Sequence, residues 1–203
     1  MVGRLLILIA MMLTGPLFIE VYLYHPMIAL EHDKAAMVPM VVSPLVLFSG
    51  FLLLAADNRL TAIIFGLACA VSIATGVIGT TIHVAMHTDT LLSLATDPNV
   101  WLGQPPILVP LSFAAAGCLG LIPLSMPGQR KLAQPPVAIG RLIEALAALA
   151  AFVAVIAGAM VEGGTVALFA VIAALGFGSF GFMAEIAVLA YPFVRERMAR
   201  RSA

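Results

Sequence analysis

The sequence predicts an all-α integral membrane protein, a polytopic bundle of six transmembrane helices. Of its 203 residues, 63% are hydrophobic and 10% are charged, whereas a soluble domain averages about 45–50% apolar and 25% charged residues. The mean hydropathy is +1.13. Six stretches are also apolar over about 20 residues, the length that a helix needs to cross a bilayer. These observations exclude an ordinary water-soluble fold.

The six predicted spans account for most of the chain, so we expect a single transmembrane domain over residues 1–203. Polar, glycine or proline residues separate the spans, as Asp57-Asn58-Arg59 does between the second and the third. The first apolar run is longer than the core of a secretory signal, so we expect it to be retained. The spans cover about residues 5–24, 37–56, 60–86, 107–126, 142–160 and 166–194.

The basic residues predict the orientation of the bundle. If the N-terminus is inside, nine of the ten Lys and Arg residues fall on the inner side, and Lys34 falls on the outer side. Because basic loops remain in the cytoplasm, both termini are expected there, in a bacterial-type inner (plasma) membrane. The loops at 25–36, 88–106 and 161–165 then face the periplasm or the exterior. The inner residues are Arg4, Arg59, Arg130, Lys131, Arg141, Arg195, Arg197, Arg200 and Arg201.

The charge and the cysteine content of the chain argue against two classes of protein. Ten basic residues balance ten acidic ones, so the chain lacks the basic surface that a nucleic-acid partner requires. Cys69 and Cys118 lie within apolar runs, which argues against a disulfide-stapled secreted scaffold. The expected partners are the lipid bilayer and either another membrane protein or a second copy, packed through the Gly and Ala faces of the fifth and sixth spans.

Small residues predict which helix faces point into the bundle, because they let membrane helices approach closely. On the third span, one continuous face carries Ser72, Gly76, Gly79, His83 and His87, at offsets of 4, 3, 4 and 4.

Similar stripes of small residues place two carboxylates, Glu144 on the fifth span and Glu185 on the sixth, on inward-pointing faces near the inner end. There Arg141 or Arg195 could neutralise them. We expect a structural ion pair at this place rather than a proton path.

All four histidines are predicted to gather at the outer surface, His25 and His32 in the first loop and His83 and His87 at the end of the third span. A spacing of four residues puts two imidazoles on one helix face, about 5–6 Å apart between Cβ atoms. Such a pair can chelate one metal ion, with a third ligand from His25, His32 or Glu20. The candidate carboxylate ligands are Glu20, Glu31, Asp33 and Asp89.

Copper is the metal that the neighbouring residues favour, because thioethers select its reduced state. The nearby methionines are Met27, Met37, Met40 and Met86. Zinc and iron fit the same histidine and carboxylate donors. The leading hypothesis is therefore an outward-facing transition-metal site for metal handling or for redox chemistry on a hydrophobic substrate.

A b-type haem is an alternative cofactor, since histidines on two helices at one depth can hold it. His25 with His83 or His87 meets that requirement, and Gly76 and Gly79 would make room for the macrocycle. A single haem, however, would use only one histidine of the pair on the third span.

Two further functions remain open, and with them the question of whether the protein is an enzyme. One is a zinc-dependent membrane hydrolase in which Glu20 or Asp89 activates water, although no H-E-x-x-H motif is present. The other is a non-catalytic accessory or assembly subunit of a membrane complex, in which the histidines only meet water or cap helix ends.

Overall fold

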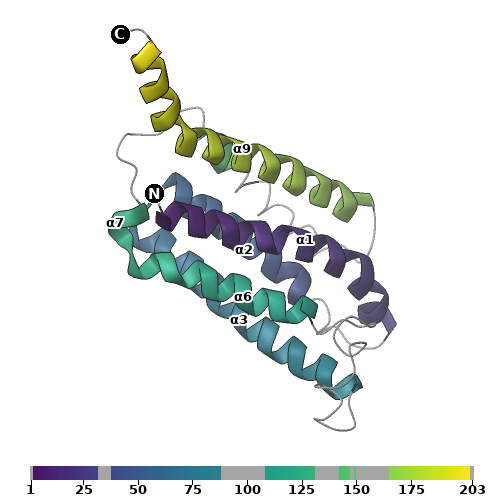
Figure 1. Ribbon diagram of the computed structural model, residues 1–203. Helices are drawn as coiled ribbons and strands as arrows, with labels where there is room; N and C mark the ends of the chain where they lie inside the picture. The colour runs from purple at the N-terminus through teal and green to yellow at the C-terminus, as the bar shows by residue number, and fades with distance from the viewer. Residues whose placement is uncertain are drawn as a thin grey trace.

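The computed structural model is helical, and the residues that it describes include no strand (Figure 1). The structure describes residues 2–31, 38–87, 108–130, 142–146, 149 and 165–201. The all-α class is therefore confirmed for these parts of the chain. The helices are α1 (Val2–Glu31), α2 (Val38–Ala55), α3 (Arg59–His87), α6 (Leu108–Leu121), the 3₁₀ helix η2 (Ile122–Ser125), α7 (Pro127–Arg130) and α9 (Thr165–Arg201).

Two of these helices are long and apolar enough to cross a membrane. They are α2, over Val38–Ala55, and the segment Arg59–Met86 of α3, each with a mean hydropathy of 2.2. Shorter apolar helical segments cover Val2–Gly15 and Val109–Ser125. By length and composition, two helices within the described residues are therefore candidate membrane spans.

The long helices lie side by side (Figure 1). Helices α1, α2, α3 and α6 alternate in direction along the chain, and α9 runs in the same direction as α6. α6 packs along α3, while α1 packs against both α2 and α6. The N-terminus, the turn at residues 56–58 and α7 share one end, called here the N-terminal end. α1 and α3 finish at the opposite end, where α6 begins, and this is called the histidine end. The order of the chain therefore brings the ends of α1 and α3 together.

The observed helix boundaries agree with the predicted second and third spans to within one residue, but two helices run further. α1 continues to Glu31, so His25 lies in a helix and not in the loop predicted for it. Apolar helix formers follow Pro26, and membrane helices tolerate proline. α9 reaches Arg201 because its last turns are rich in Arg, Met and Ala. Of the predicted fifth span, the structure describes residues 142–146 and 149, which are helical.

Glycines allow α3 and α6 to pack closely. A Cβ atom added at Gly76 would lie 2.7 Å from the carbonyl oxygen of Pro110, and one at Gly79 would lie 2.8 Å from the Cβ of Pro110. The hydroxyl of Ser72 donates a hydrogen bond of 2.8 Å to the carbonyl oxygen of Phe113. The inward face predicted for this helix is therefore confirmed at Ser72, Gly76 and Gly79.

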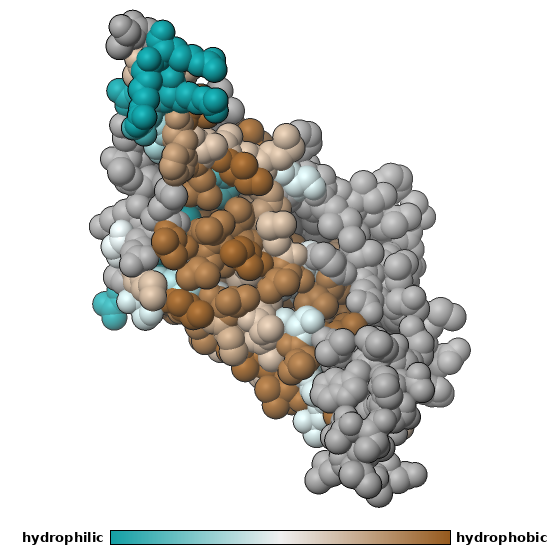
Figure 2. Space-filling view, viewed as in Figure 1, coloured by the Kyte–Doolittle hydropathy of each residue, from teal (hydrophilic) through white to brown (hydrophobic). Residues whose placement is uncertain are grey.

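The opposite face of α3 is apolar and exposed. Only 28% of its apolar window is buried, and apolar residues cover much of the described surface in Figure 2. Soluble monomers rarely expose contiguous apolar patches larger than a few hundred Å². The exposed large side chains of α3 are Leu60, Ile63, Leu67, Val71, Val77, Ile78, Ile82 and Met86.

Candidate functional site

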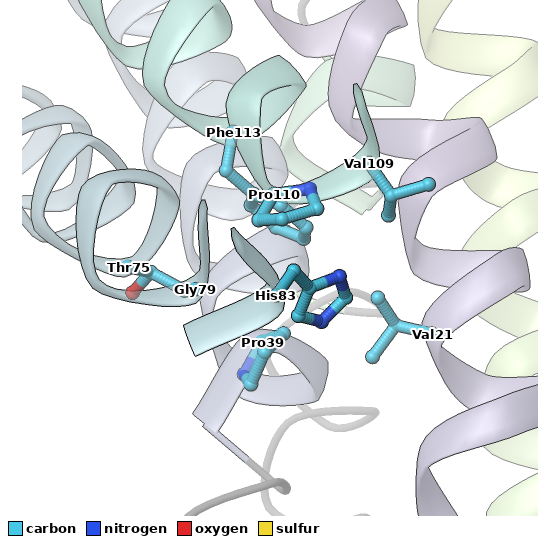
Figure 3. A pocket seen from close by; sticks show the side chains of 8 residues that line it. All are labelled: Val21, Pro39, Thr75, Gly79, His83, Val109, Pro110 and Phe113. Carbon is cyan, nitrogen blue, oxygen red and sulfur yellow. The ribbon is translucent and has the colours of Figure 1, made fainter. Parts of the chain in front are cut away.

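A small, partly open cavity of about 40 Å³ lies at the histidine end, where four helices meet (Figure 3). This volume is far below the range of about 300–1,000 Å³ that small-molecule sites have, and it is enough for a few water molecules. Its walls come from α1, α2, α3 and α6. The lining residues are Val21, Pro39, Thr75, Gly79, His83, Val109, Pro110 and Phe113.

His83 is the titratable side chain among these lining residues. Its imidazole is half-buried and is turned toward the space between Val21, Pro39 and Pro110 (Figure 3). Imidazole is the commonest protein ligand of transition metals, and each ring nitrogen can act separately as a donor or an acceptor. The arrangement therefore offers a metal-binding side chain within mostly apolar walls.

The packing of α3 against α6 positions His83. Gly79 stands one turn before His83, and the ring of Pro110 fills the space that a side chain at Gly79 would need. Pro110 lies in the first turn of α6, where a missing backbone N–H is tolerated. These contacts show that Gly76 and Gly79 make room for α6. The haem alternative stays a prediction.

Four other predicted ligands lie in the parts of α1 and α3 at this end, but the structure does not describe their side chains. Glu20, His25 and Glu31 belong to α1, and His87 is the last residue of α3. Position 25 follows the cavity-lining Val21 by four residues, which places it one turn further along the same face of α1. The predicted ligands His32, Asp33 and Asp89 lie outside the described residues.

Within the described residues, no three His, Cys, Asp or Glu side chains form a group that could hold a metal ion. His83 is the predicted ligand whose side chain the structure describes in the cavity. The metal site therefore stays a prediction.

A second group of ionisable residues is buried near the N-terminal end. Arg4 in α1 donates from Nε to Oε1 of Glu185 at 2.5 Å and from Nη2 to Oε2 at 2.6 Å. Its Nη1 donates to the carbonyl oxygen of Leu54 at 3.0 Å. Oε1 of Glu144 lies 3.6 Å from Nη2 of Arg4. The exposed fractions of Arg4, Glu144 and Glu185 are 2%, 1% and 0%.

This buried cluster confirms that Glu144 and Glu185 point inward, as the stripes of small residues predict. Sequence reasoning missed Arg4 as their partner, because it counted this residue among the charges of the inner surface. The available signal was the position of Arg4 next to an apolar run, which makes it part of the first helix. A bidentate ion pair between a guanidinium and a carboxylate is stronger than a neutral hydrogen bond. Here it joins the first helix to the last.

A further ion pair lies at the N-terminal end. Nη2 of Arg130, the last residue of α7, is 3.1 Å from Oδ1 of Asp57, which lies between α2 and α3. The side chains are 9% and 17% exposed. The two ends of the bundle therefore differ in chemistry, with paired charges at one end and an imidazole in an apolar cavity at the other.

Comparison of the chain with known protein families, with curated proteins and with solved structures found no match. The functional argument therefore depends on the geometry of the chain itself.

Proposed function

We propose that the protein is a six-helix integral membrane protein that holds a transition metal ion at its histidine end, for metal handling or redox chemistry. The observation that carries this proposal is the cavity into which His83 points. Its wall includes Val21, so the part of α1 with Glu20 and His25 lies beside the end of α3. In this proposal, residues of two helices supply the nitrogen and oxygen donors.

The exposed apolar face of α3 supports the membrane part of the proposal. Exposed apolar side chains are unfavourable in water, but they are compatible with the hydrocarbon interior of a bilayer. α1, α6, α9 and the segment around 142–160 complete the six spans.

The distribution of charge supports the orientation. Arg4, Arg59 and Arg130 belong to the N-terminal end, and α9 finishes in the basic run Arg195 to Arg201 at the same side (Figure 1). Basic residues mark the cytoplasmic side of a bilayer. The histidine end then faces the periplasm or exterior of a bacterial-type inner membrane.

The surroundings of the cavity favour copper. Met40 packs against the buried cluster that includes Val21 and Phe113, two residues of the cavity wall. A thioether at this place adds a soft donor to imidazole, a combination that suits reduced copper. His87, one turn after His83 on the same helix face, supplies the second imidazole of the proposed site.

Metal analysis of the detergent-purified protein tests this proposal. We expect roughly one copper per chain in the wild type and its loss in His83→Ala and His87→Ala, since both imidazoles are proposed ligands. Cys118→Ala is the matched control, because it removes an exposed soft sulfur on α6 outside the cavity wall. The control should keep its copper.

The other outcomes separate the alternatives. Zinc in place of copper would redirect the site to hydrolysis, and iron with a Soret band would assign it to haem. A protein that takes up no metal but purifies with a partner in fixed stoichiometry would overturn the metal proposal and favour an accessory subunit.

Cysteine labelling tests the orientation. In a background lacking Cys69 and Cys118, we expect Thr90→Cys to react with an impermeant reagent in intact cells, and Asn58→Cys to react only after permeabilisation. The reverse pattern would contradict the proposed topology.

A further inference from the structure

The last turns of α9 form a C-terminal arm, defined here as residues 191–201. Every residue of the arm is exposed. Pro192 lies inside the helix, and a proline at such a position kinks a helix. Figure 1 shows α9 bending before it ends and running past the rest of the bundle, with hydrophilic residues at its tip in Figure 2.

The arm is amphipathic. Tyr191, Val194 and Met198 follow one another at offsets of 3 and 4, so they form a single apolar stripe. Their exposed fractions are 47%, 51% and 59%. The helical periodicity places Arg195 on one side of this stripe and Arg201 on the other.

The opposite face of the arm carries charged side chains together with the exposed ring of Phe193. There Nη2 of Arg200 lies 2.5 Å from Oε1 of Glu196. The arm carries four arginines, Arg195, Arg197, Arg200 and Arg201, against the single carboxylate of Glu196. Its net charge is therefore positive, and its charge is concentrated beyond the apolar part of α9.

We propose that the C-terminal arm docks onto anionic lipid headgroups of the leaflet at the N-terminal end of the bundle. An apolar stripe flanked by arginine is the pattern of a helix that lies in the membrane interface. Guanidinium groups bind phosphate with paired hydrogen bonds, and the cytoplasmic leaflet attracts basic segments next to a membrane span. The inference depends on the membrane orientation proposed above but not on the metal.

Fluorescence of the full chain in lipid nanodiscs tests the docking. A polarity-sensitive probe is attached to Met198→Cys in a background with Cys69→Ala and Cys118→Ala, and quenching by a water-soluble quencher is measured. We expect quenching about fivefold or more weaker in discs with phosphatidylglycerol than in phosphatidylcholine alone. Arg195→Gln with Arg201→Gln should remove this protection, because each arginine near an anionic surface contributes about fivefold.

Two control positions separate the arm from the membrane proposal. A probe at Glu196→Cys, beside Arg200 and away from the apolar stripe, should stay accessible in both lipids. A probe at Leu67→Cys, on the exposed face of α3, should be protected in both. If position 67 is accessible, the membrane proposal is wrong. If position 67 is protected while position 198 shows equal quenching in both lipids, anionic docking of the arm is wrong and the membrane proposal stands.

Discussion

The surroundings of the ionisable side chains differ between the two ends of the bundle. Near the N-terminal end, Arg4 is buried with Glu144 and Glu185, and the protein itself supplies the opposite charges. At the histidine end, His83 is half-buried and faces a cavity whose walls are mostly aliphatic and proline residues. The comparison teaches that the charges which hold helices together are paired within the protein, whereas the imidazole at the proposed binding site borders a cavity.

The buried cluster also explains how α9 is attached to the bundle. Glu185 receives two hydrogen bonds from α1, and three residues before it Phe182 meets Phe51 of α2 edge to face, with ring centroids 5.5 Å apart. An aromatic pair of this kind contributes about 0.5–1.5 kcal/mol. The last helix is thus fixed near the N-terminal end by one ionic and one aromatic contact.

The largest effect is expected from Arg4→Met. Removing the cation leaves two carboxylates buried beside a thioether, and breaking a buried pair costs about 3–5 kcal/mol. The free energy of unfolding, measured by circular dichroism in mixed detergent, should fall by that amount. Adding Glu185→Leu should recover part of the loss, because it removes a buried charge that Arg4→Met leaves behind. Equal stability of Arg4→Met and the wild type would show that the cluster does not stabilise the fold.

A smaller loss is expected from Gly76→Ala, which tests the packing that positions His83. The new Cβ would lie 2.7 Å from the carbonyl oxygen of Pro110, and overpacking of this kind costs about 1–3 kcal/mol. No described atom lies within 4 Å of a Cβ added at Gly15, so Gly15→Ala is the matched control. It should be neutral or gain up to about 1 kcal/mol from helix propensity. A destabilised control with an unaffected Gly76→Ala would contradict the close α3–α6 contact.

Local sequence signals predicted the parts of the structure that depend on single helices. Apolar run length placed α2 and α3 to within a residue, and the spacing of small residues identified the face of α3 that carries Ser72 and Gly79. The predicted ends of α1 and α9 fall too early, because polar residues and proline do not end a helix when good helix formers follow them.

Features that depend on contacts between distant helices could not be predicted. The partnership of Arg4 with Glu185 depends on where the first and last helices lie in space. The wall residues Val21 and Val109 were missed for another reason. When a helix is apolar all round, its sequence pattern does not distinguish a residue facing lipid from one lining a cavity.

A still smaller loss is expected from Ser72→Ala, which removes the hydrogen bond to the carbonyl oxygen of Phe113 midway between the two ends. Such bonds between membrane helices contribute about 0.6 kcal/mol on average. The same detergent unfolding measurement should show a decrease of this size. Thr81→Ala is the control, since the Thr81 hydroxyl bonds within its own helix, to Val77. A loss in the control as large as in Ser72→Ala would indicate a general helix effect.

The smallest effect on stability is expected from His83→Gln, the histidine-end counterpart of Arg4→Met. His83 is half-buried, and glutamine keeps a polar group at the cavity, so the free energy of unfolding should change by no more than about 0.5 kcal/mol. Bound metal, measured by mass spectrometry on the same sample, should nevertheless be lost, because an amide is a poor substitute for imidazole as a ligand of copper or zinc. Arg4→Met should show the opposite combination, in which the folded fraction keeps its metal although stability is much lower. If His83→Gln destabilised the protein as strongly as Arg4→Met does, the histidine end would also be a structural element, and the distinction between the two ends would be wrong.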